Sequence, residues 1–160
     1  MPSYRITRYN HPSQNWMEAV LALRAEFGDA EPEPFVSFIT RRLEDETMLL
    51  ILAWESPPQG ERDRPVGYGL AFDVETDPAK PEWTRTGYIS QFLVAESHRQ
   101  KGVGAQLMEV VDAWFAERGL TKVLLNVNID NPAGIRFWQK HGFEAYALRM
   151  KRVRKTAAKG

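Results

Sequence analysis

The sequence predicts an α/β (α+β) fold built on a mixed, mostly antiparallel central sheet that is flanked by helices. Three strands are expected in succession, at Met48–Trp54, Val66–Val74 and Thr86–Val94, and strands joined without a helix between them form antiparallel meanders. A strand–helix–strand unit follows from Thr86 to Val127, which favours a parallel pair with a right-handed crossover. The fold class therefore combines an antiparallel meander with one parallel strand pair.

The N-terminal part of the chain predicts one strand and two helices before the meander begins. Ser3–Tyr9 alternates in polarity and predicts a strand. Ser13 or Asn15 is a candidate cap for a helix that runs through Phe27 and ends at a glycine. A second short helix is expected at Phe35–Leu43, where apolar residues recur at helical spacing.

The C-terminal part predicts two further helices and two strands. Val103–Arg118 is an amphipathic helix that a glycine ends, and Lys122–Val127 is a short apolar strand. Pro132–His141 carries proline in its first turn and glycine after its end, which is the expected asymmetry of a helix. Phe143–Val153 alternates in polarity and is expected to close the sheet as a last strand.

Composition limits the classes of function. The chain has 160 residues, enough for one domain over residues 1–154, with residues 155–160 as a flexible tail. Lys+Arg and Asp+Glu both number 21, and this balance argues against nucleic-acid or membrane-surface binding. Neither a spanning apolar run nor a signal-peptide pattern is present, so we expect a cytoplasmic protein. The lack of cysteine excludes disulfides and a covalent acyl-cysteine, and the histidines lack metal-ligand spacing.

The segment Arg99–Ala105 has the most informative local pattern. A strand ends just before it, and a helix is expected to start at its glycines, Gly102 and Gly104. The first N–H groups of a helix have no internal partner and lie at the positive end of its dipole, so such a start binds phosphate. A glycine pair of this kind also marks an ordinary tight turn. The P-loop and dinucleotide motifs are both absent, because they need Gly-Lys-Ser/Thr and a third glycine.

Two motifs together resemble one family. Arg99-x-x-Gly102-x-Gly104 resembles the pyrophosphate-binding signature of the GNAT superfamily of acyl-CoA N-acyltransferases. Asn131–Phe143 (NPAGIRFWQKHGF) is similar to the second half of that family, in which Asn-x-x-Ala leads a helix that ends in Gly-Phe. The resemblance is close over Thr86–Arg149, and the order of the earlier elements agrees with it.

The resemblance implies acetyl-CoA as cosubstrate and no metal. The strand before the glycines would diverge from its parallel neighbour and pair with the pantetheine arm through Phe92, Leu93 and Val94. A backbone N–H near Leu93 or Val94, assigned to Leu93, would face the thioester carbonyl as a catalytic oxyanion donor. The diphosphate would lie along Arg99, Gln100, Lys101, Gly102, Val103, Gly104 and Ala105. On the later helix the cofactor would border Asn131, Ala133, Arg136 and Phe137, of which Asn131 is also a typical N-cap and Arg136 is equally a solvated arginine.

The acid and base of the chemistry do not follow from the resemblance. Many family members carry a tyrosine as general acid where this chain has Trp138, and protein-acetylating members carry a glutamate base where it has Tyr88. Hydroxyls on expected strands are Tyr68, Tyr88 and Tyr146, each of which is also a common sheet aromatic. We take Tyr88 and Tyr146 as the candidate catalytic side chains.

These observations predict an N-acetyltransferase in which a primary amine attacks acetyl-CoA directly in a ternary complex. The alternatives are a non-catalytic acyl-CoA-binding domain and a transferase of longer acyl groups. The acceptor would be a small-molecule amine or a peptide or protein amine, and a homodimer is possible because family members often dimerise. Acceptor determinants are expected in the first two helices and the 75–86 loop. Glu31 and Glu33, between those helices, would attract a cationic amine if they are more than solvated carboxylates.

Overall fold

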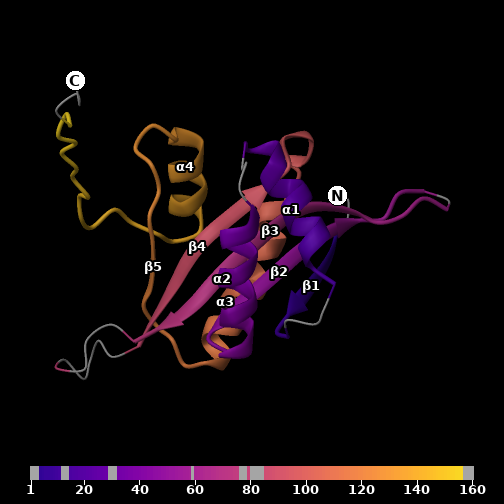
Figure 1. Cartoon of the computed structure of the whole chain (residues 1–160), viewed down its shortest axis with the longest axis horizontal. Helices are drawn as coiled ribbons and strands as arrows, with labels where there is room; N and C mark the ends of the chain where they lie inside the picture. The colour runs from indigo at the N-terminus through magenta and orange to yellow at the C-terminus, as the bar shows by residue number, and fades with distance from the viewer. Residues whose placement is uncertain are drawn as a thin grey trace. The chain divides into compact units, whose positions relative to one another are not determined.

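The computed structural model describes residues 4–11, 15–28, 32–58, 60–75, 79 and 85–156. It forms two compact units, Met1–Asn126 and Val127–Gly160, and each is described by itself. Figure 1 shows the elements in chain order, from the indigo N-terminal strand to the yellow C-terminal segment. Of the helices in the described ranges, none is long and apolar enough to cross a membrane.

The first unit contains a five-stranded sheet in the order β1-β2-β3-β4-β5. The first four strands are antiparallel neighbours, whereas β4 and β5 run parallel. The predicted mixed, mostly antiparallel sheet is therefore confirmed. The strands are β1 (Arg5–Tyr9), β2 (Met48–Glu55), β3 (Arg64–Val74), β4 (Thr86–Val94) and β5 (Val123–Leu125).

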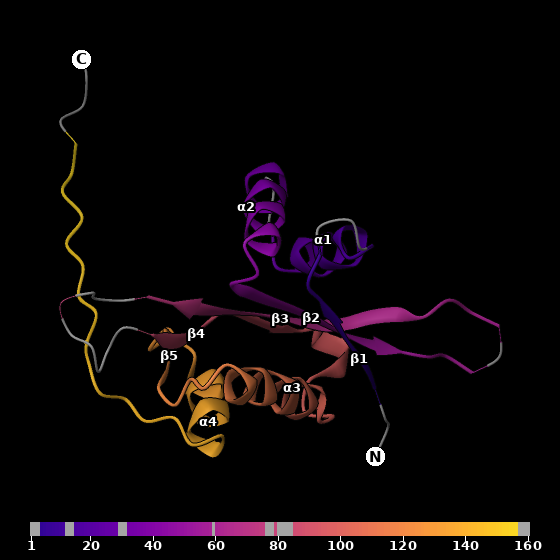
Figure 2. The ribbon, with the colours of Figure 1, turned by 90° about the horizontal axis from the view of Figure 1, so that it is seen from below.

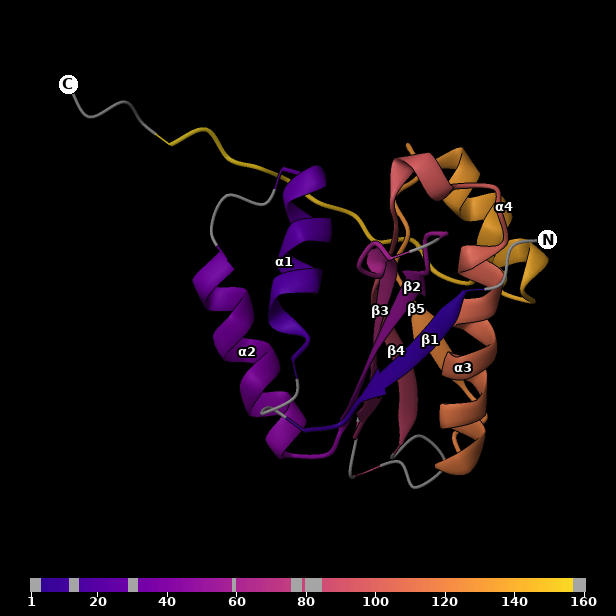
Figure 3. The same ribbon diagram turned by 90° about the vertical axis from the view of Figure 1, so that its right-hand side faces the viewer.

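Helices cover both faces of this sheet. Figures 2 and 3 show α1 (Met17–Glu26) and α2 (Pro32–Glu44) on one face and α3 (Val103–Glu117) on the other. The sequence of α3 explains its attachment, because its buried residues recur at helical spacing and form one apolar stripe. These residues are Val103, Leu107, Met108, Val111, Trp114 and Phe115.

The core on the first face joins the middle of the sheet to α1 and α2. Leu50 and Leu52 of β2 pack there with Val20 and Ile39, and all four side chains are fully buried. Ile51 lies between the two leucines and is also fully buried. Since each such side chain contributes about 1.5–3 kcal/mol when it leaves water, β2 anchors the layers on both sides of it.

β4 is irregular at one residue. Leu70 of β3 pairs with Gln91, and the next residue, Ala71, pairs with Ile89, so Ser90 is the additional residue of a β-bulge. The parallel pairing with β5 ends at Ile89 as well. Beyond this point β4 keeps β3 as its neighbour on one side, and the other edge has no partner strand in the described sheet. This divergence agrees with the splayed strand pair that the family resemblance implies.

The second unit contains α4 (Pro132–Lys140), followed by an irregular segment over residues 143–156. The closing strand expected at Phe143–Val153 is therefore wrong. The segment has the alternation of a strand, and its apolar side chains Leu148, Met150 and Val153 are exposed. Alternation specifies which face a strand would bury, but a strand also needs a partner for its backbone, and the described part of this unit offers no other strand.

Other expectations differ in detail or lie outside the described residues. The N-cap residue of α1 is Trp16 and no side chain caps this helix, so Asn15 does not take that role. Gly28, which follows α1, has φ +83°, the left-handed conformation that is typical of a glycine ending a helix. The predicted cap Ser13, the carboxylate Glu31, most of the 75–86 loop and residues 157–160 lie outside the described residues.

Candidate functional site

The end of β4 directs part of its backbone toward the edge that β5 leaves open. Ala95 donates to the carbonyl of Val66, at 2.8 Å from nitrogen to oxygen. Backbone groups of an antiparallel strand alternate in direction, so the N–H and C=O of Leu93 also point to β3. Those of Phe92 and Val94 point to the open edge. The sequence offered the backbone N–H of Leu93 or Val94 as the oxyanion donor. The N–H of Val94 points to the open edge, whereas the N–H of Leu93 belongs to the β3–β4 ladder.

Arg99 lies across this edge. Its Nε donates to the carbonyl oxygen of Val94 at 3.3 Å, which places that carbonyl on the open side, as the alternation requires. Its guanidinium carbon lies 5.3 Å from the ring centroid of Phe27, at the end of α1. Arg99, the first residue of the glycine motif, therefore connects the end of β4 to the end of α1 and adds positive charge there.

The glycine segment turns the chain from β4 into α3. A short 3-10 helix, η2 (Glu96–His98), precedes it, and Gln100 and Gly102 then adopt left-handed backbone conformations with φ 60° and 84°. Gly102 is the N-cap residue of α3, no side chain caps the helix, and its first turn holds no acidic residue. A Cβ at Gly102 would meet no atom within 4 Å. The first N–H groups of α3 therefore lie at a helix start that has no side-chain cap, is open and is electropositive.

Gly67 holds β4 close to α3. A Cβ at this position would lie 2.9 Å from the carbonyl oxygen of Leu93, 3.2 Å from Cγ1 of Val103 and 3.3 Å from Cδ1 of Leu107. The missing side chain allows the end of β4 and the first turns of α3 to approach β3 together. This packing fixes the open edge and the glycine segment relative to each other.

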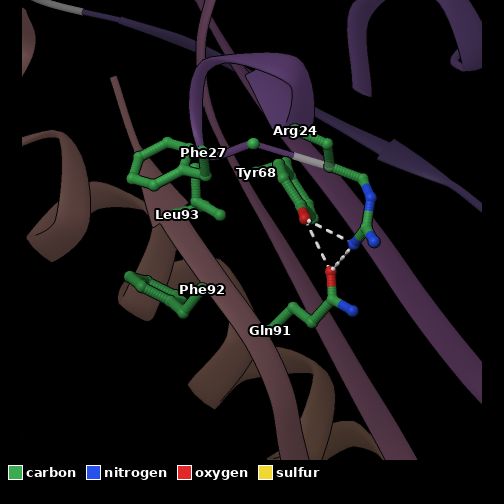
Figure 4. Close-up of a pocket in the computed structure, with 7 residues that line it drawn as sticks. Arg24, Phe27, Tyr68, Gln91, Phe92 and Leu93 are labelled. Atoms are coloured by element: carbon green, nitrogen blue, oxygen red, sulfur yellow. Dashed lines mark hydrogen bonds between the residues drawn. The ribbon is translucent and has the colours of Figure 1, made fainter. Parts of the chain in front are cut away.

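A cavity of about 330 Å³ lies beside the open edge. Figure 4 shows polar side chains meeting at one side of it and apolar side chains at the other. Its polar side is a hydrogen-bonded cluster, in which Nη1 of Arg24 lies 2.6 Å from Oε1 of Gln91 and the hydroxyl of Tyr68 donates to the same oxygen at 2.6 Å. The lining residues are Arg24, Phe27, Gly28, Tyr68, Gln91, Phe92 and Leu93.

The candidate hydroxyls occupy different places. Tyr68 lies in the cavity cluster and is fully buried. Tyr88 is not among the residues that line the cavity, and its hydroxyl accepts a hydrogen bond from Nδ2 of Asn126 at 2.8 Å. Tyr146 lies in the irregular segment of the second unit. Tyr68, which the sequence marked as one hydroxyl among three, is therefore the tyrosine that the structure brings to the end of β4.

The predicted cofactor residues of the second unit lie at the start of α4 and along it. Asn131 caps the helix, since its Oδ1 accepts a hydrogen bond from the N–H of Gly134 at 2.9 Å, and Pro132 follows in the first turn. Ala133, Arg136 and Phe137 belong to the same helix. The capping role of Asn131 is confirmed, while contact between these residues and the cofactor stays a prediction.

Sequence reasoning missed two polar members of the cavity, Arg24 and Gln91. Arg24 looks like an ordinary cation in the last turn of a helix, where it complements the dipole. Gln91 lies in a strand whose strict alternation would place it on the same face as Ile89, until the bulge at Ser90 is taken into account. Among the described residues, no group of His, Asp and Glu side chains is arranged to hold a metal ion.

Comparison with known proteins decides the family. The model of the acetyltransferase (GNAT) family matches residues 14–143, which is most of the chain. This chain belongs to the GNAT family. Among curated relatives, the uncharacterized N-acetyltransferase YobR of Bacillus subtilis is 32% identical over 69 residues, 43% of this chain and 28% of that protein. The match thus spans little more than a quarter of the relative's length.

Solved GNAT-like structures share the fold at low sequence identity. The aminoglycoside N-acetyltransferase AAC(6')-Iy in complex with CoA has a TM-score of 0.74 and 17% identity, over 97% of this chain and 96% of the other. AAC(6')-Ih, an aminoglycoside 6'-N-acetyltransferase from Acinetobacter baumannii, has a TM-score of 0.75 and 15% identity, over 97% and 100%. At these identities the likeness establishes the fold.

Proposed function

We propose that this GNAT protein transfers an acetyl group from acetyl-CoA to a primary amine, by direct attack in a ternary complex. One observation carries the proposal: the open edge of β4 is followed, after the short helix η2, by the uncapped glycine start of α3. An extended chain with a diphosphate at one end matches this arrangement, because the edge offers strand-like hydrogen bonds and the helix start offers N–H groups to an anion.

The residues present fit such a cosubstrate. The N–H groups at the start of α3 and the charge of Lys101 would hold the diphosphate, and Arg99 adds a second cation nearby. The backbone of Phe92 and Val94 would pair with the pantetheine arm. Acetyl-CoA supplies an activated acetyl thioester when bound. The N–H of Val94, directed to the open edge, is our choice for the group that stabilises negative charge on the carbonyl oxygen.

The cavity beside Leu93 is the proposed acceptor side. An alkyl ammonium titrates near ~10.4, so one proton must leave before the nitrogen attacks. The described lining residues include neither His nor a carboxylate, and we assign removal of that proton to water in the cavity. A thiol titrates near ~8.5, so the leaving sulfur needs little help from an acid. Tyr88 and Tyr146 stay candidate catalytic residues, and Tyr68 joins them as the hydroxyl in the cavity.

The test measures CoA binding and CoA thiol release separately. Thiol release on adding acetyl-CoA and members of a broad amine panel supports the transferase. Binding of CoA without thiol release from any amine would instead support a non-catalytic acyl-CoA-binding domain. Comparing acetyl-CoA with longer acyl-CoAs tests the acyl preference.

A substitution at Gly104 tests the assignment of the glycine segment to CoA. We expect Gly104→Val to weaken CoA binding at least tenfold while the fold survives, because a side chain in the first turn of α3 would crowd the diphosphate that we propose to bind there. Gly104→Ala is the matched control with a smaller side chain and a smaller expected loss. Unchanged CoA affinity in folded Gly104→Val would overturn the assignment of the glycine segment. A homodimer stays a prediction, to be tested by sedimentation.

A further inference from the structure

The short helix η2, which precedes the glycine segment, is held by a side-chain pair. Nε2 of His98 lies 2.9 Å from Oε2 of Glu55, the last residue of β2, and the His98 side chain is only 16% exposed. The other ring nitrogen, Nδ1, lies 2.8 Å from Oγ of Ser97. An ionised carboxylate can only accept a hydrogen bond, so Nε2 carries a proton, and in the neutral ring Nδ1 accepts from the Ser97 hydroxyl. Both nitrogens of His98 are thus bonded, and the ring has one defined orientation.

Two further contacts fix the position of η2. The ring of Tyr4 packs edge-on against the His98 ring, with centroids 6.3 Å apart, and the Tyr4 N–H donates to Oε1 of Gln106 in α3 at 3.3 Å. At the end of α1, Oε1 of Glu26 accepts a hydrogen bond from the N–H of Glu96, the first residue of η2, at 2.9 Å. Contacts from β2, from the chain before β1 and from α1 therefore converge on this one turn.

The backbone that follows η2 needs to be held in this way. Three residues separate His98 from Gly102, and one of them, Gln100, has φ 60°. This left-handed conformation is disfavoured for a residue with a Cβ and persists where the surrounding structure enforces it. At its other end the segment joins α3, which its apolar stripe holds against the sheet. If η2 were released, Gln100 could relax and the N–H groups of the glycine segment would reorient.

We infer that His98, bound to Glu55, is a positioning residue for the diphosphate of the donor. The inference rests on the proposed function, since it takes the glycine segment as the diphosphate site. His98 acts through the backbone, because it holds η2 and thereby the N–H groups from which an anion would accept hydrogen bonds. Glu55 contributes as a hydrogen-bond acceptor rather than through its charge, since a negative charge near the site would by itself repel an anion.

The test compares two donors that differ in the diphosphate. Acetyl-CoA carries it, whereas S-acetylpantetheine keeps the thioester and the pantetheine arm without it. For each donor, kcat/KM is measured by thiol release with the best amine of the panel. We expect His98→Leu to lower kcat/KM for acetyl-CoA about tenfold or more, through KM rather than kcat, and to change the value for S-acetylpantetheine less than about twofold. A general loss of structure would instead lower kcat/KM for both donors alike.

Conservative variants of the two partners test whether the hydrogen bond is the cause. The amide N–H of His98→Gln lies near the place of Nε2 and should retain most of the CoA affinity, whereas the shorter side chain of His98→Asn should lose it as His98→Leu does. Glu55→Gln keeps an acceptor and should also retain the affinity. Glu55→Ala should weaken CoA binding about tenfold or more, even if His98→Leu fails to fold. Loss of the negative charge alone would have the opposite effect and would tighten the binding of an anion.

Calorimetric titration with CoA measures Kd for each variant without turnover. The double variant of Glu55→Ala and His98→Leu should bind CoA no more weakly than either single variant, because both substitutions remove the same contact. Arg8 pairs with Glu117, in the last turn of α3, at 3.0 Å. Arg8→Gln is therefore the matched control, which removes an ion pair at the opposite end of α3 and should leave the Kd for CoA unchanged.

The outcomes separate the inference from the function beneath it. An equal loss for both donors, tighter CoA binding by Glu55→Ala, or an additive loss in the double variant overturns the role of His98 and leaves the transferase intact. Binding of CoA without thiol release from any amine overturns the transferase, while the Kd values of the variants still decide the role of His98. If the wild type does not bind CoA, the assignment of the glycine segment fails and the inference fails with it.

Discussion

Gly67→Ala is the substitution whose effect the structure defines most closely. The new Cβ would lie 2.9 Å from the carbonyl oxygen of Leu93, below the separation that real Cβ atoms keep. That oxygen belongs to the β3–β4 ladder, so it cannot rotate away as the end of a side chain would. Val103 and Leu107, at 3.2 Å and 3.3 Å, close the other directions. Either β4 must shift from β3 or α3 must shift from the sheet.

Either of these shifts is expected to lower the stability of the Gly67→Ala variant. Adding atoms to a well-packed core typically costs about 1–3 kcal/mol. We expect Gly67→Ala to lower the free energy of unfolding by about that amount, toward the upper end, since one of the opposing atoms is backbone. CoA affinity should fall as well, because the displaced elements are the open edge of β4 and the start of α3.

Urea unfolding, followed by the fluorescence of the five tryptophans, measures the cost. Gly69→Ala is the matched control, two residues along the same strand. Its Cβ would meet side-chain atoms of Ile51 and Phe92, the nearest at 3.3 Å, and side chains can adjust. We expect a loss below about 1 kcal/mol for this control. Equal losses in the two variants, or a Gly67→Ala protein as stable as the wild type, would refute the reasoning.

Three further predictions concern other parts of the chain. A hydrogen bond from Arg85, together with one from Arg118 at 2.8 Å, lowers the pKa of the Asp73 carboxyl. The ionised carboxylate therefore stabilises the folded protein, and this contribution is complete above about pH 4 and is lost as the pH falls through the lowered pKa. Asp73→Asn should therefore lose stability at neutral pH and show a weaker dependence on acid than the wild type, as urea midpoints across the acid range would report; parallel pH profiles would contradict this. Gly102→Ala should cost about 1–2 kcal/mol, because φ is +84°, and Gly102→Asn should cost less; thermal unfolding that ranks them otherwise would count against backbone strain. Trp138→Phe should change the transfer rate less than about tenfold, as expected for a packing residue, and a collapse of the rate at unchanged CoA affinity would reveal a specific role for Trp138.

Much of the fold followed from the sequence because its signals are local. The strand β2 begins with a continuous apolar run over Met48–Trp54, and α3 combines a glycine start with an apolar stripe. The prediction of the donor side rests on the same kind of local signal, since the glycine segment is contiguous and its position between β4 and α3 is visible in the sequence.

The cavity that we propose as the acceptor side did not follow from the sequence, because its parts are remote along the chain. Arg24 and Gln91 are 67 residues apart and meet only through the packing of α1 on the sheet. The bulge at Ser90 also prevents the face of Gln91 from being predicted, because one additional residue reverses the alternation of side chains along β4. The unformed strand at Phe143–Val153 is a related case, in which the pattern of one segment says nothing about the availability of a partner.

The bulge at Ser90 has a consequence for how the site can vary. The register on either side of it, Leu70 with Gln91 and Ala71 with Ile89, would continue as a regular ladder if Ser90 were deleted. The side chains that face the cavity would then keep their faces, while the extra twist that turns β4 away from β5 would be lost. Under the proposed function, recognition of the acceptor and access for the donor would thus depend on separable features of one strand. Changes of residue type can retune the first, whereas a change of length by a single residue can close the second.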